Sequence, residues 1–296
     1  MSRNIDINDD EIRVIGDNVQ SDGGRRSRMW LNVLAVFMVL LGALSVSLCH
    51  HKVSKLENEN ITVMDSDTLN SLFEGGVAPD GEWYSNRDSR HGSEVVIEDT
   101  VVNGVALRIF TPYNLRAELH VGEVDTADGN ILLCTQAADV RRDNHKILGA
   151  FVYKGEPLAW GLSKRGYCAI INNDINVGVA DNSPWFEEAT ERGGYFFRQY
   201  PLVDNGKAVI NNPENSSIRR ALCSWKNRIC IIASEDPITM NAFSEMLANM
   251  GVRDAIYLVG SNSAHGWVAD SQGRHLYFST HHSRMPENIN YILFRK

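Results

Sequence analysis

The sequence predicts a strand-rich, mixed α/β domain with a βαβ unit near its C-terminus, preceded by one transmembrane helix. Short apolar runs separated by turn residues indicate strands, and they fill the first half of the domain: Glu94–Ile97, Val105–Phe110, Ala117–Val121, Asn130–Cys134 and Leu148–Tyr153. Apolar residues recur at helical spacing over Met240–Met250, between two continuous apolar runs, Arg228–Ala233 and Ala255–Val259. Two such runs joined by a helix predict parallel neighbouring strands with a right-handed crossover.

Composition and net charge argue against some classes of binding partner. The 296 residues are 43% hydrophobic and 22% charged, which is typical of a globular protein. A net charge of −8 argues against nucleic acid as a partner. The five cysteines form no C-x-x-C pair and the nine histidines are scattered, so we expect neither a metal site nor a cofactor.

An uncharged run of apolar residues, 29–48, has about the ~20 residues that a helix needs to cross a bilayer. A cleaved signal peptide is the alternative, but the polar segment ahead of the run is long and no A-x-A site follows it. Arg25, Arg26 and Arg28 favour a cytoplasmic N-terminus. The predicted order is a disordered cytoplasmic tail (1–28), a signal anchor in the lipid bilayer (29–48), a tether (49–66) and an extracytoplasmic domain (67–296). We therefore expect a single-pass membrane protein.

Small polar residues follow the second apolar run of the predicted βαβ unit, at Gly260, Ser261, Asn262 and Ser263. Asp236 follows the first run, after Ser234 and Glu235. Because the carboxyl ends of parallel strands lie at one edge of a sheet, where open α/β sheets bind ligands, we expect both loops to border one pocket. A plain turn is the alternative, since Gly, Ser and Asn favour turns for backbone reasons alone.

A second cluster follows the apolar run Ala169–Ile171. Asn172 and Asn173 are candidates for binding sugar hydroxyls, and Asp174 is a candidate general acid or base. A turn held by its own Asx side chains is the alternative here. Arg219, in the pair Arg219-Arg220, is a candidate phosphate ligand, with a solvated surface pair as the alternative.

Four segments in this order resemble motifs of the phosphodiester glycosidase family: AIINNDI, RRALC, FSEMLANMG and AIYLVGSNS. The resemblance covers about residues 120–296 and is closest to an uncovering-enzyme-like group in a divergent bacterial branch. It matches Asn172, Arg219 and Ser263 to family positions. Val259 stands where the family has an aspartate, and the family's glycine triplet is reduced to Gly260.

The resemblance implies a hydrolase that cleaves a sugar-1-phosphate diester or a related glycoconjugate outside the membrane. Asp174 and Asp236 would then be the catalytic carboxylates, and a carbohydrate or sugar phosphate the ligand. Because valine cannot ionise, the alternative is a catalytically inactive relative that binds envelope glycans or phosphate-bearing polymers. Whether the chain is an enzyme is therefore open at this stage, and a purely structural tethered domain is a third alternative.

Overall fold

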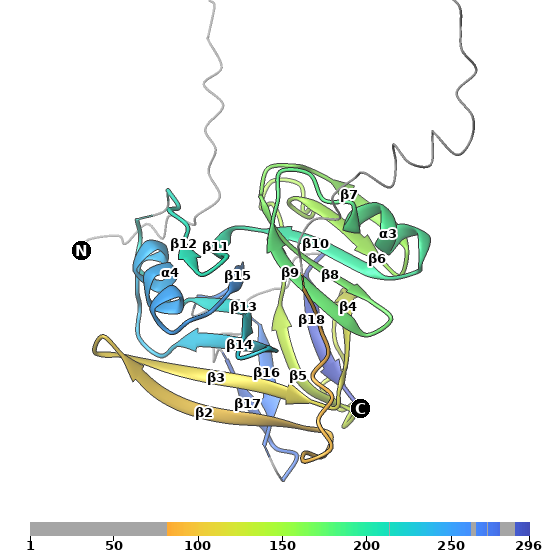
Figure 1. The fold of residues 1–296 in the computed structure, drawn as a ribbon. Helices are drawn as coiled ribbons and strands as arrows, with labels where there is room; N and C mark the ends of the chain where they lie inside the picture. The colour runs from red at the N-terminus through yellow and green to blue at the C-terminus, as the bar shows by residue number, and fades with distance from the viewer. Residues whose placement is uncertain (1–81, 213, 262–264, 271, 279–287) are drawn as a thin grey trace, which may run out of the picture. The chain divides into compact units, whose positions relative to one another are not determined.

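The computed structural model in Figure 1 describes residues 82–212, 214–261, 265–270, 272–278 and 288–296. These residues belong to one of the two compact units into which the chain divides. The predicted tail (1–28), signal anchor (29–48) and tether (49–66) lie outside the described residues, as does the start of the predicted domain. Within the described ranges, no helix has the length and apolar character needed to span a bilayer.

The described strands form three sheets, and every pairing recorded among them is antiparallel. Sheet A has the order β1 (Trp83–Tyr84), β9 (Asp174–Val179), β8 (Gly166–Ile171), β10 (Tyr195–Gln199), β6 (Ala150–Tyr153) and β7 (Glu156–Trp160). Sheet B has the order β12 (Lys207–Ala208), β11 (Pro201–Asp204), β15 (Asp254–Leu258), β13 (Arg220–Trp225), β14 (Arg228–Ser234), β3 (Val105–Tyr113) and β2 (Glu94–Val102). Sheet C has the order β17 (His275–Tyr277), β16 (Gly266–Ala269), β5 (Ile131–Gln136), β18 (Asn290–Arg295) and β4 (Arg116–Val121).

The predicted mixed α/β class and its βαβ unit are wrong. Both apolar runs are strands, β14 and β15, but β13 lies between them and pairs antiparallel with each. The two strands therefore point in the same direction without being neighbours. Lys226 and Asn227 explain the difference, because both have positive φ (49° and 60°) and form the two-residue turn of a β13–β14 hairpin. The sequence prediction omitted β13.

The predicted helix is confirmed as α4 (Met240–Asn249). Thr239 caps its first turn by accepting a hydrogen bond from the Ala242 amide at 3.2 Å. Apolar residues of α4 and of one face of sheet B form one cluster, which includes Phe243, Leu247, Ala221, Cys223 and Ile232. A second helix, α3 (Trp185–Glu191), packs on sheet A.

The opposite face of sheet B packs against the other two sheets. Leu222, Ile231 and Ile256 of sheet B share a buried cluster with Phe151 of sheet A and Leu133 of sheet C. Successive strand residues point to opposite faces. Sheet B is thus covered by α4 on one face and by strands of sheets A and C on the other. A side chain at the edge of sheet B therefore points either toward the α4 side or toward the side of sheets A and C.

The loop that leaves β15 packs tightly against the chain that enters β13. The Ser261 amide, at a φ of 80°, donates to the Ile218 carbonyl at 2.9 Å. The Gly260 amide donates to the Tyr257 hydroxyl at 3.0 Å. A β-carbon at Gly260 would overlap the Ile218 carbonyl oxygen and lie 3.2 Å from the Arg219 Cα. Only glycine fits this position without movement of the backbone.

We therefore predict that Gly260→Ala lowers the free energy of unfolding by about 1–3 kcal/mol, the usual cost of forcing extra volume into a packed site. Gly92→Ala is the matched control, because a β-carbon there has no heavy atom within 4 Å. Denaturant unfolding of both variants of the full chain measures the difference. Equal stability of the two variants would contradict the close packing of this loop.

Candidate functional site

The ends of three strands form one rim of sheet B. In the strand register, Arg220 at the start of β13 lies opposite Ala233 of β14 and opposite Leu258 of β15. Because β13 runs antiparallel to both, its first residue lies between the carboxyl ends of its neighbours. The rim therefore brings together Arg220, the loop after β14 and the loop after β15. The loop that carries Gly260 and Ser261 is at this rim, and Asn262 and Ser263 lie outside the described residues.

Arg219 and Arg220 enter different environments, because adjacent residues of an extended chain point to opposite faces. Arg219 is fully buried. Its guanidinium donates to the carbonyls of Ile238 and Asn215 and lies 5.8 Å from the Tyr257 ring centroid. These contacts hold the buried Arg219 side chain against the loop that leads into α4. It does not line the cavity at the rim, as far as the described residues show.

Arg220 is 2% exposed and lines a cavity of about 280 Å³ at the rim. Its Nη1 donates to the Val259 carbonyl at 3.1 Å and to the Thr135 hydroxyl at 3.3 Å, and its guanidinium stacks 4.3 Å from the Phe278 ring centroid. Its buried Nε has no hydrogen-bond partner, and no carboxylate of the described residues forms an ion pair with it. Burial lowers the pKa of Arg220 to about 10.

The other walls of this cavity, which we call the Arg220 cavity, carry both polar and aromatic groups. Arg108 and Glu235 line it, with their Nη1 and Oε1 atoms 3.5 Å apart. Arg108 also pairs with Asp99 at 2.7 Å, and the paired carboxylate raises its pKa. Tyr277, 57% exposed, lines the opening. Glu235 is the one carboxylate that lines the cavity among the described residues.

The two predicted catalytic carboxylates do not line this cavity. Asp236 is exposed in the loop after β14, one residue beyond Glu235. Asp174 opens β9 and pairs across the hairpin with Ile171. Neither residue borders either of the cavities described here.

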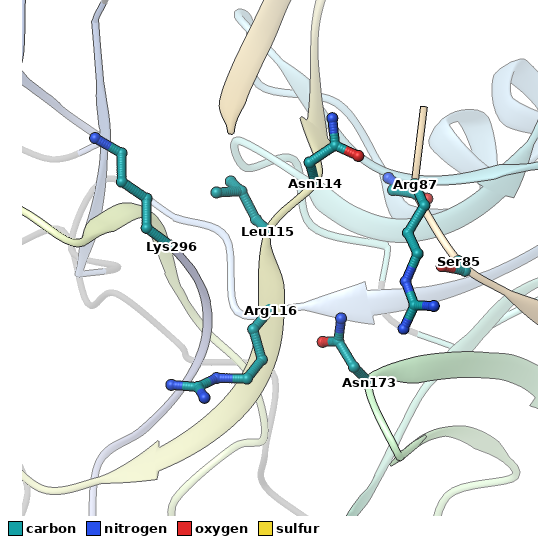
Figure 2. A pocket seen from close by; sticks show the side chains of 8 residues that line it. Ser85, Arg87, Asn114, Leu115, Arg116, Asn173 and Lys296 are labelled. Carbon is teal, nitrogen blue, oxygen red and sulfur yellow. The ribbon is translucent and has the colours of Figure 1, made fainter. Parts of the chain in front are cut away.

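Asn172 and Asn173 form the tight turn between β8 and β9. Both have positive φ, 53° and 71°, as a two-residue hairpin turn requires. Asn172 is exposed, whereas the Asn173 Oδ1 accepts a hydrogen bond from the Ala117 amide at 2.8 Å. Asn173 lines a different cavity, of about 340 Å³, together with Arg87 and Arg116 (Figure 2). The two asparagines thus close a hairpin, and the recorded bond of the Asn173 side chain goes to a residue outside the turn.

The two cavities lie at different positions along β3. Arg108 and Phe110, in the middle of this strand, line the Arg220 cavity. Asn114, one residue beyond the end of β3, lines the cavity of Figure 2. An antiparallel strand rises about 3.4 Å per residue, so the two walls are separated by several residue lengths. The structure therefore does not bring the Asn172–Asn173 turn and the Gly260 loop to one cavity.

Sequence reasoning missed the residues that make the Arg220 cavity. Arg220 was passed over because its neighbour Arg219 matches the family position, and only the strand register shows which arginine faces the cavity. Tyr277 and Phe278 come from the β17 hairpin, far along the chain, and no local pattern connects them with Arg220. Glu235 was noted beside Asp236, but a sequence alone does not show which of two adjacent acids lines a wall.

Comparisons with known proteins support the fold alone. No family model matches the chain, and no curated protein matches it either. Among solved structures, the chain is similar to the zebrafish N-acetylglucosamine-1-phosphodiester alpha-N-acetylglucosaminidase catalytic domain auto-inhibited by its pro-peptide, at 13% identity and a TM-score of 0.54, over 76% of this chain and 90% of that one. A hypothetical protein from Synechocystis matches at 13% identity and a TM-score of 0.49, over 68% of this chain and 62% of that one. The described domain is thus a distant structural relative of a phosphodiester glycosidase domain.

Proposed function

We propose that the domain binds a phosphate-bearing glycan or sugar phosphate in the Arg220 cavity. The observation that carries this proposal is a buried guanidinium with no carboxylate partner among the described residues. An uncompensated buried charge costs several kcal/mol. A phosphate group in the cavity would supply a countercharge and hydrogen-bond acceptors for this guanidinium.

Tyr277 supports a sugar as the second part of the ligand. Its side chain is largely exposed at the mouth of the cavity, next to Phe278, which stacks on Arg220. An exposed aromatic ring offers an apolar face for a sugar ring and a hydroxyl for hydrogen bonding. Arg220 would then bind the anionic group while Tyr277 contacts the sugar. Ser261 borders the same rim through its hydrogen bond to Ile218.

Hydrolysis of a sugar-1-phosphate diester is the second candidate function, and Glu235 is the observation that favours it. A carboxylate on the wall beside two arginines is a candidate general acid or base. Glycoside hydrolysis uses two carboxylates, about 5–10 Å apart across the scissile bond, and the described wall provides one. Binding without turnover therefore fits the described residues better.

The membrane assignment stays a prediction from the sequence. We propose that residues 29–48 anchor the chain in the bilayer and that the ligand-binding domain lies outside the cytoplasm, where envelope glycans and phosphate-bearing polymers would be accessible.

Arg220→Gln should weaken binding of a sugar 1-phosphate about tenfold to a hundredfold, because hydrogen bonds to a charged group contribute about 1.5–3 kcal/mol. Tyr277→Ala should weaken binding of the sugar 1-phosphate more than binding of inorganic phosphate, because the variant removes only the contact with the sugar. Calorimetric titration of the full chain measures both, with circular dichroism to establish that the variants are folded. Unchanged affinity in folded Arg220→Gln would remove this residue from the site.

An aryl sugar phosphodiester tests the second candidate in the same preparation. We expect binding without release of the aryl group. Turnover that Glu235→Gln abolishes while leaving binding intact would instead establish the hydrolase.

Binding should also depend on pH through Arg220. Its pKa is lowered to about 10, so the guanidinium is charged at neutral pH and loses its proton as the pH rises through 10. We expect the affinity for a sugar 1-phosphate to be constant from pH 8 to 9 and to fall above pH 10, whereas the Arg220→Gln variant shows no such step. Titrations across this range, at pH values where circular dichroism shows a folded protein, measure the effect.

A further inference from the structure

We propose that the cavity of Figure 2 is a second anion site, which takes a phosphate monoester. It has a volume of about 340 Å³ and is lined by residues that follow the C-terminal end of β3, whereas the Arg220 cavity is lined by residues from the middle of that strand. Its walls come from the segment after β1, the β3–β4 connection, the β8–β9 hairpin and Lys296. This site is independent of the function proposed for Arg220.

The cavity is lined by three cationic side chains and by no Asp or Glu side chain among the described residues. Arg87, Arg116 and Lys296 carry the charge. None of these side chains has a hydrogen bond or an ion pair with any residue, as far as the described part of the chain is concerned. An anion bound in this cavity would be attracted by the positive charge of the three side chains that line it.

Arginines just outside the cavity differ, because each has an acidic partner. Arg90 and Arg228 share Asp88, at 2.7 and 2.8 Å. Arg295, next to Lys296 in the chain, pairs with Glu118 at 3.0 Å and with Asp128 at 2.8 Å. Of the basic residues compared here, those that line the cavity have no acidic partner among the described residues, whereas their three neighbours do.

Two asparagines hold the walls in place. The Asn86 Nδ2 donates to the carbonyls of Pro112 and Ile229, both at 2.6 Å, and its Oδ1 accepts from the Ile229 amide at 2.9 Å. The Asn114 side chain likewise bonds to both the amide and the carbonyl of Asp88, at 2.9 and 2.8 Å. The backbone that carries Arg87 is thus tied to sheet B on one side and to the β3–β4 connection on the other.

Asn173 adds a neutral donor with a fixed orientation. Its Oδ1 is occupied by the Ala117 amide, at 2.8 Å, which leaves the Nδ2 as the free group of the side chain. Asn173 and Arg87 both line this cavity (Figure 2). The free polar groups of Arg87, Arg116, Lys296 and Asn173 can therefore only donate hydrogen bonds.

A lining in which cationic and amide donors predominate favours an oxyanion. A phosphate monoester carries nearly two negative charges at neutral pH and three acceptor oxygens, so it uses more of these donors than a carboxylate does. The cavity leaves room for a substituent such as a sugar. Because Arg87 and Arg116 are exposed, binding should weaken as salt is added.

The test compares Arg87→Gln/Arg116→Gln with Arg142→Gln, an exposed arginine that lines neither cavity and has no ion pair with a described residue. The full chain of the wild type and of each variant is titrated with inorganic phosphate and with a sugar 1-phosphate. We expect the double variant to lose one binding site, or at least tenfold in its affinity, and Arg142→Gln to behave as wild type. Arg220→Gln should leave phosphate binding at this second cavity unchanged. The proposals for the two cavities can therefore be refuted independently of one another.

Short-chain phosphatidylglycerol is titrated in parallel to separate a lipid headgroup from a soluble phosphate. If the double variant binds both phosphate probes as wild type does, the proposal is wrong. If it loses binding of the lipid alone, the site is a headgroup site and the assignment to a phosphate monoester is overturned.

Discussion

The β13–β14 hairpin is the constraint on which the rim and the Arg220 cavity depend. Its two-residue turn, Lys226-Asn227, pairs Trp225 with Arg228 and so fixes the register of the whole hairpin. α4 then carries the chain back across one face of sheet B, and β15 adds to the free edge of β13. The start of β13 is thereby held between two carboxyl strand ends. A slip of one residue would turn Arg220 to the opposite face of the sheet and remove its guanidinium from the cavity.

Local patterns predicted the elements of this unit but not their arrangement. α4 and the strands on either side of it were recognisable, because apolar spacing reports which face is buried. β13 was missed since it begins with Arg220, and a buried arginine breaks the apolar pattern of a strand. The order strand, helix, strand along the chain is the same in both arrangements. The two strands can be neighbours in the sheet, or a third strand from an earlier part of the chain can lie between them. The wrong fold class follows from that ambiguity.

The candidate site was predictable only in part, for a similar reason. The loop at Gly260 and Ser261 was placed correctly at a strand end, although what Gly260 provides is close packing against Ile218. The turn at Asn172-Asn173 has the same kinds of residue, yet its conformation is explained by the hairpin it closes. A turn and a ligand loop favour the same small polar side chains. Only contacts between distant segments, such as that of Asn173 with Ala117, show which cavity each loop borders.

Val259 connects the departure from the family pattern with the proposed binding function. The resemblance implies an aspartate at this position, and the Val259 carbonyl lies 3.1 Å from the Arg220 guanidinium. This contact is made by the main chain, so it does not depend on which side chain stands at this position. Valine carries no charge of its own, and no carboxylate among the described residues pairs with Arg220, whose pKa burial lowers. Under the proposed function, an external anion in the Arg220 cavity would supply the missing countercharge.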